Sequence, residues 1–86
     1  FAIAPFVGII DGRPELTPAP GEVDRVFDVA LSELLGPGTH HVERWDRFGA
    51  ERTMHFFEVD GETVWGATAR ILAGFLGHLT GVAPVP

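Results

Sequence analysis

Three carboxylates that follow a proline-rich loop are the first residues whose type and spacing could carry chemistry. Glu22 comes directly after Pro20-Gly21, and Asp24 and Asp28 share its parity along the chain. In an extended segment, residues of one parity lie on one face. Carboxylate oxygens are preferred ligands of Mg²⁺. The same pattern is expected for the solvated face of a half-buried strand, so the spacing leaves a metal site and a solvated face both open.

Four histidines are the next candidates. His40 and His41 are adjacent, and His55 and His78 fall on other expected elements. Neighbouring residues of a strand point to opposite faces, so His40 and His41 cannot easily share one ion with Glu43. The sequence therefore favours histidines that are exposed or paired across a hairpin over a histidine metal site.

Composition excludes several classes of function. The net charge is −6, with twelve acidic residues against six arginines and no lysine, so a phosphate-binding surface for nucleic acid is not expected. There is no Cys for a disulfide, a thiolate nucleophile or a Cys-based zinc site. No apolar run approaches the ~20 residues that cross a bilayer, so we expect no membrane partner. We expect a cytoplasmic location. Because residue 1 is Phe and Met54 is the only Met, we expect a fragment of a longer protein, and the lysine-free composition suggests a bacterial source.

The first half of the chain predicts two strands separated by a loop. Phe1–Ile10 is apolar on both faces, which is typical of a central strand covered on both sides. Residues 13–21, which are rich in proline, are expected to form an ordered loop. From Glu22 to Leu31 apolar residues alternate with acidic ones, which indicates a half-buried strand. Leu31–Leu35 should form about one helical turn, ended by Gly36-Pro37-Gly38.

The second half predicts a hairpin, a short strand and a helix. Residues 41–48 and 52–59 are strand-like, and Asp60-Gly61 is a strong turn signal before the strand Thr63–Trp65. The final segment is helical, ends at Gly81, and is expected to bury one stripe: Val64, Ala67, Thr68, Ile71, Phe75 and Leu79. The fold class is therefore α+β, with a mixed sheet and a C-terminal amphipathic helix packed on it.

The most informative stretch is Val64–Leu72, which joins a strand to a helix through a Trp-Gly junction. Together with Pro5–Gly8, Leu16–Val23 and Val26–Val29 before it, in the order and spacing expected of the family, it makes the chain resemble the C-terminal half of a Nudix hydrolase, and in particular the branch that hydrolyses coenzyme A. The resemblance covers nearly all of residues 1–86. It implies one Nudix domain with an α/β/α sandwich, of which this chain is the C-terminal part.

The resemblance implies a Mg²⁺- or Mn²⁺-dependent pyrophosphohydrolase that acts on a small nucleotide substrate such as coenzyme A. The Arg-Glu and Glu-Glu pairs of the family's catalytic helix are absent here, as is the motif that marks coenzyme A specificity. The reaction is therefore expected of the parent protein, and this segment alone should be inactive. Nudix enzymes often add a carboxylate from a loop outside the catalytic helix, and Glu22 is the candidate for that catalytic and metal-binding role.

Trp65 and Thr68 are the candidate substrate-binding residues. A Trp ahead of a helix could stack on an adenine, although a large aromatic there also packs as part of the core. The helix N-terminus that follows could favour a phosphate. The alternative to an enzyme is a non-catalytic α+β module that binds a ligand or a partner and needs a second chain, either a homodimer partner or an N-terminal half, to cover the apolar strand Phe1–Ile10.

Overall fold

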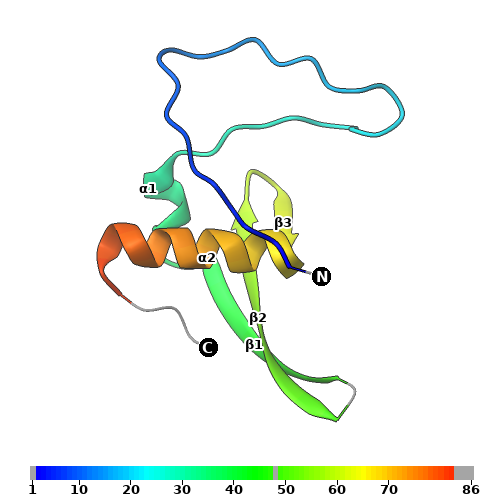
Figure 1. Cartoon of the computed structure of the whole chain (residues 1–86), viewed down its shortest axis with the longest axis vertical. Helices are drawn as coiled ribbons and strands as arrows, with labels where there is room; N and C mark the ends of the chain where they lie inside the picture. Colours follow the sequence, from blue (N-terminus) through cyan, green and yellow to red (C-terminus); the bar gives the residue numbers. More distant parts are fainter. Residues whose placement is uncertain (1, 48, 83–86) are drawn as a thin grey trace.

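A three-stranded antiparallel sheet and a C-terminal helix form the folded part of the chain, in a computed structural model that describes residues 2–47 and 49–82. The elements are α1 (Leu31–Leu34), β1 (His40–Arg47), β2 (Ala50–Val59), β3 (Glu62–Trp65) and α2 (Gly66–Thr80), with strand order β1-β2-β3. Figure 1 shows α2 lying across the sheet and α1 above the left part of α2. The predicted α+β class is confirmed.

Both hairpins form where turn residues permit them. Strands β1 and β2 pair from His40 opposite Phe57 to Arg47 opposite Ala50. At the second turn, Asp60 has φ 51° and Gly61 has φ 75°. Positive φ at both central residues defines the turn whose twist matches that of the flanking strands. The predicted Asp60-Gly61 hairpin and its short return strand are confirmed.

The core lies between one face of the sheet and α2. Phe57 has no exposed surface and Val59 is 3% exposed. These two residues are two positions apart, so they lie on the same face of β2. The side chains packed with them come from α1 and α2: Leu34, Ala69, Ala73 and Leu76. Two of the three α2 residues are Ala, and such small side chains let the helix backbone approach the sheet closely.

The predicted buried stripe of α2 was wrong in phase. Ala69, Ala73 and Leu76 are buried, whereas Ile71 is 36% exposed and Leu79 is 52% exposed; Ala67 and Thr68 are also exposed. The helix carries apolar residues on two faces, so spacing alone did not select the one that meets the sheet. The predicted end of the helix is confirmed: Gly81 has φ 75° and its N–H donates to the Gly77 carbonyl at 2.8 Å.

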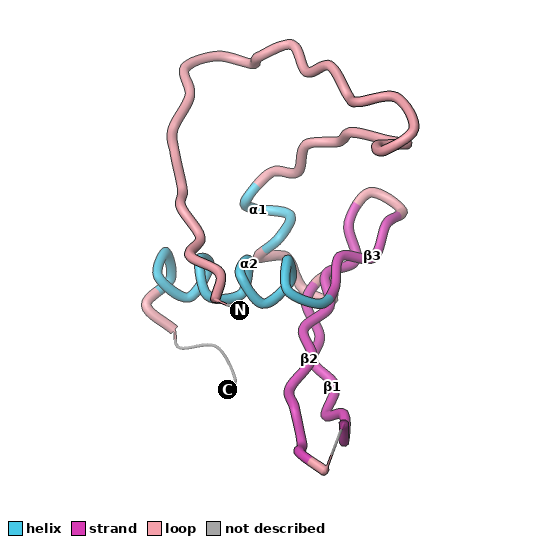
Figure 2. Tube along the Cα trace, turned by 45° about the vertical axis from the view of Figure 1, so that its right-hand side comes forward, coloured by secondary structure: helices cyan, strands magenta, loops and turns pink. Residues whose placement is uncertain are grey.

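Neither predicted strand in the first half of the chain forms. No strand occurs within residues 2–39; Phe1, the first residue of the expected strand, lies outside the described residues, as does Phe48. Phe6 is 93% exposed and Ile9 is 96% exposed. Figure 2 shows the chain before α1 as a long loop that arcs away from the sheet. The backbone of this loop therefore has no neighbouring strand to pair with. Of the segment after Glu22, Phe27 and Val29 pack against the core.

No helix among the described residues is long and apolar enough to cross a membrane.

Candidate functional site

Glu22 lies at a tight turn of the long loop. The backbone N–H groups of Glu22 and Val23 both donate to the carbonyl of Ala19, at 3.2 and 3.1 Å. Gly21 has φ 81°, a conformation that favours glycine. The Pro20-Gly21 pair therefore reverses the chain just before Glu22, and the turn leaves the Glu22 side chain exposed to solvent.

The other two carboxylates of the predicted cluster do not gather around Glu22. Asp28 forms an ion pair with Arg13, and both side chains are largely exposed. Within residues 2–47 and 49–82, no group of three His, Asp or Glu side chains is arranged to hold a metal ion. These residues do not fit a complete Mg²⁺ or Mn²⁺ site, so we assign them no metal-dependent step. A role for Glu22 as one ligand of a larger site stays a prediction.

Trp65 and Thr68 lie together at the start of α2. Trp65 is the last residue of β3 and precedes the helix in an extended conformation, and Gly66 follows with φ 68°. The Trp65 side chain is 55% exposed, and Thr68 is exposed in the first turn of the helix. A core role would bury the indole. Trp65 is therefore not part of the core that the described residues form.

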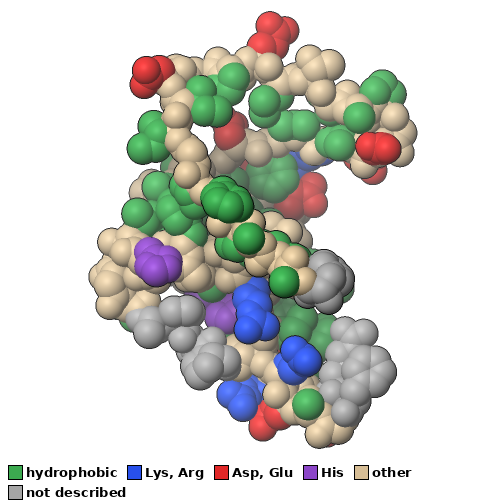
Figure 3. Space-filling model, in the orientation of Figure 1, with side chains coloured by type: hydrophobic (Ala, Val, Ile, Leu, Met, Phe, Trp, Pro, Cys, Tyr) green, Lys and Arg blue, Asp and Glu red, His purple; other side chains and the backbone are tan. Residues whose placement is uncertain are grey.

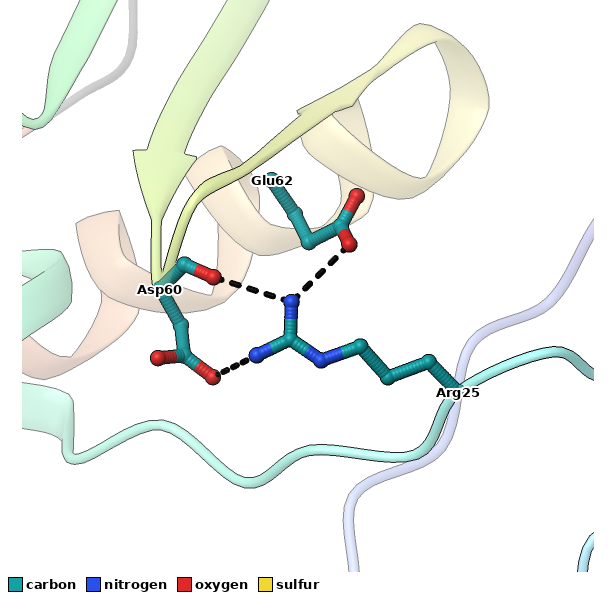
Figure 4. Close-up of polar contacts among 3 residues, drawn as sticks. All are labelled: Arg25, Asp60 and Glu62. Carbon is teal, nitrogen blue, oxygen red and sulfur yellow. Dashed lines mark hydrogen bonds and ion pairs between the residues drawn. The ribbon is translucent and has the colours of Figure 1, made fainter.

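Arg25 connects the loop to the turn between β2 and β3, and the sequence analysis missed it. Its guanidinium contacts Asp60 and Glu62, as Figure 4 shows. Glu22 lies three residues before Arg25, and Trp65 lies three residues after Glu62. Arg25 lies 35 positions from Asp60 and 37 from Glu62 in the sequence, so no local pattern could have revealed these two contacts.

His40, His41 and His55 pair with aromatic rings across the β1–β2 hairpin, whereas His78 lies on α2. His40 Nε2 lies 2.9 Å from His55 Nδ1, and the His40 ring stacks on Phe57 with centroids 4.4 Å apart. On the other face, His41 stacks on Phe56 at 4.9 Å. Burial, and then the nearby charges of His55 and His41, lower the pKa of His40. The prediction of hairpin-paired histidines is confirmed.

An open groove of about 1230 Å³ lies between the N-terminal segment, the β1–β2 hairpin and α2. Its lining combines apolar side chains, such as Ile71 and Phe75, with Arg44, Arg52 and Arg70. Figure 3 shows blue Arg side chains below α2 on this face. Glu22, Trp65 and Thr68 do not line it, although Gly66 and Ala67, which lie between Trp65 and Thr68 in the sequence, do.

The sequence is similar to that of two curated Nudix hydrolases. An uncharacterized Nudix hydrolase, NudL, of Photorhabdus laumondii is 31% identical over 84% of this chain. Nudix hydrolase 15, mitochondrial, of Arabidopsis thaliana is 32% identical over 81%. The chain is therefore related to Nudix hydrolases, although it spans only 38% and 27% of the lengths of these two relatives. No family model and no solved structure matches it.

Proposed function

We propose that this chain is part of a Nudix-type hydrolase that cleaves the diphosphate linkage of coenzyme A or of a related nucleoside diphosphate derivative. The observation that carries the proposal is the similarity to two Nudix hydrolases over more than four fifths of the chain. In the reaction, water attacks one phosphorus of the diphosphate and the bridging P–O bond breaks. Coenzyme A would give adenosine 3′,5′-bisphosphate and 4′-phosphopantetheine. A divalent cation, Mg²⁺ or Mn²⁺, would neutralise the phosphates and activate the water.

Within this reaction, Glu22 has a supporting role. Its carboxylate is exposed at a turn that Gly21 makes possible, so it is free to reach a metal ion or a water bound by other residues of the native polypeptide. Trp65 would bind the nucleobase by stacking, because its indole is 55% exposed. Thr68 would contact the substrate from the first turn of α2, where unpaired backbone N–H groups also favour a phosphate.

The test uses the native polypeptide, coenzyme A and Mg²⁺. Phosphorus NMR of the reaction should show the diphosphate signal replaced by two phosphomonoester signals in equal amounts, apart from the 3′-phosphate already present. Chelation of the metal should stop the reaction. If the diphosphate signal of coenzyme A and of a panel of nucleoside diphosphate derivatives stays unchanged, the enzyme proposal fails.

A non-catalytic module that needs a second chain is the other candidate function. The observation that favours it is the exposure of apolar side chains along the N-terminal segment, including Phe6 at 93% and Ile9 at 96%. Contiguous exposed apolar surface marks an interaction site. Size-exclusion chromatography with light scattering separates the two proposals when it is combined with the assay: an inactive dimer supports the module, and an active species of any size supports the enzyme.

A further inference from the structure

We propose that Arg25 is a positioning residue. It holds the Glu22 turn against the turn between β2 and β3, and so sets where the Glu22 carboxylate lies relative to Trp65. The inference rests on the proposed function, because Glu22 and Trp65 have their roles only within it. Arg25 itself touches no substrate in this account, and its effect passes through Glu22.

The guanidinium of Arg25 makes three hydrogen bonds to the hairpin turn. Nη1 donates to the Asp60 carbonyl at 3.0 Å and to Glu62 Oε1 at 2.9 Å, and Nη2 donates to Asp60 Oδ2 at 2.5 Å. Figure 4 shows the guanidinium between the two acidic residues. A planar fork with several N–H donors can satisfy all three acceptors at fixed angles, whereas the ammonium of lysine is a single point charge.

The turn that Arg25 contacts has a defined shape. Asp60 is the one non-glycine residue with positive φ among those the structure describes, at 51°. In this conformation its carbonyl and its carboxylate both accept hydrogen bonds from the same guanidinium. The Arg25 guanidinium also lies 5.0 Å from the centroid of the Phe27 ring, which packs against the core. Arg25 is therefore held from its own segment as well as from the turn.

These contacts tether the loop that carries Glu22 to the turn next to Trp65, which is itself paired with Phe56 in the sheet. Glu22 lies three residues before Arg25, and Trp65 lies three residues after Glu62. Three residues of extended chain span at most about 11 Å, so neither residue can move far from the ion pair. The ion pair between Arg13 and Asp28 differs, because both partners belong to the loop and it does not tie the loop to the sheet. Arg13 is therefore the matched control for Arg25.

A double-mutant cycle in the native polypeptide tests this role with coenzyme A and Mg²⁺. Arg25→Gln should lower kcat about tenfold, because misplacing a catalytic group is costly, and should leave KM within about twofold. In the Glu22→Gln background the same substitution should have no further effect, since Arg25 acts through Glu22. Arg13→Gln should behave like the wild type, and Arg25→Lys should stay close to Arg25→Gln. Losses that multiply in the double variant, or an equal loss in Arg13→Gln, would overturn the inference.

A measurement that does not depend on activity separates this inference from the proposed function. The ¹⁵N heteronuclear NOE of the Glu22 and Val23 amides reports motion on the picosecond to nanosecond scale. It should fall in Arg25→Gln and stay at the wild-type value in Arg13→Gln. An unchanged NOE in Arg25→Gln overturns the positioning role even if the wild type is active. A lowered NOE in a protein with no diphosphate hydrolase activity keeps the tether and rejects the proposed function.

Discussion

The imidazole rings of His40 and His55 meet across the β1–β2 hairpin, with Nε2 of His40 2.9 Å from Nδ1 of His55. His55 is 5% exposed, and His40 stacks on the fully buried Phe57. At this distance one ring nitrogen donates and the other accepts, so the contact requires at least one neutral imidazole. The protonation state of this pair therefore affects how the hairpin packs against the core.

The first prediction is that acid weakens the fold through His40. Burial lowers the pKa of His40 below its ordinary value of 6.5, and the charges of His55 and His41 add to the effect. The unfolded chain then binds this proton more readily than the folded chain does. The stabilising contribution is fully present above about pH 6.5 and is lost as the pH falls through the lowered pKa of the folded state.

Chemical denaturation at a series of pH values checks this prediction. The free energy of unfolding of the wild type should decrease as the pH is lowered from 7 towards 5. The free energy of unfolding of His40→Gln should decrease less over the same range. His78→Gln is the control, because His78 is exposed near the end of α2. If wild type and His40→Gln show the same pH dependence, the explanation through His40 is wrong.

The second prediction concerns the centre of the core. Phe57→Ala should destabilise the fold by about 3–5 kcal/mol, because Phe57 has no exposed surface and packs against α2. Phe6→Ala makes the same chemical change at a side chain that is 93% exposed, and should cost less than about 0.5 kcal/mol. Urea unfolding of both variants measures the difference. Equal losses would contradict the placement of the core.

The third prediction separates two glycines. Gly74 lies inside α2 with open space where a Cβ would be, so Gly74→Ala should stabilise the fold by about 0.5–1 kcal/mol. Gly61 also has open space, but its φ is +75°. Gly61→Ala should therefore destabilise the fold by about 1–2 kcal/mol through backbone strain alone. Thermal unfolding should move the two melting temperatures in opposite directions, and a shift of both in one direction would contradict the turn geometry.

The fourth prediction concerns Trp65. If its exposed indole stacks on the nucleobase, Trp65→Ala should raise KM for coenzyme A about tenfold and leave kcat nearly unchanged. Trp65→Phe should recover most of the affinity. Trp45→Ala is the control, because the Trp45 ring tilts against Phe56 and its Nε1 donates to Glu43 at 3.1 Å. Unchanged KM in Trp65→Ala would remove Trp65 from the substrate site.

The second half of the fold could be predicted from the sequence because its signals are local. Asp60-Gly61 specifies a hairpin turn and Gly81 specifies a helix end, whatever the rest of the chain does. The strands expected at Phe1–Ile10 and after Glu22 depend on neighbours: an apolar segment becomes a strand only when another strand pairs with it. Periodicity also could not choose between the two apolar faces of α2.

The sequence proposes the members of a candidate site but not the contacts that connect their segments. Glu22, Trp65 and Thr68 stood out by residue type and by the resemblance that their segments carry. Arg25 did not, because an arginine in an acidic strand-like run has no distinguishing local pattern, and its partners Asp60 and Glu62 lie more than 30 positions away. Its role follows only from the three-dimensional contacts.

The most direct test of the central claim is the turnover of coenzyme A by the native polypeptide and its Glu22→Gln variant, in Mg²⁺. We expect the wild type to release equal amounts of adenosine 3′,5′-bisphosphate and 4′-phosphopantetheine, and Glu22→Gln to lower kcat at least about tenfold. Hydrolysis that is unchanged in Glu22→Gln would remove Glu22 from the reaction. No hydrolysis of coenzyme A or of any related diphosphate by the wild type would contradict the account as a whole.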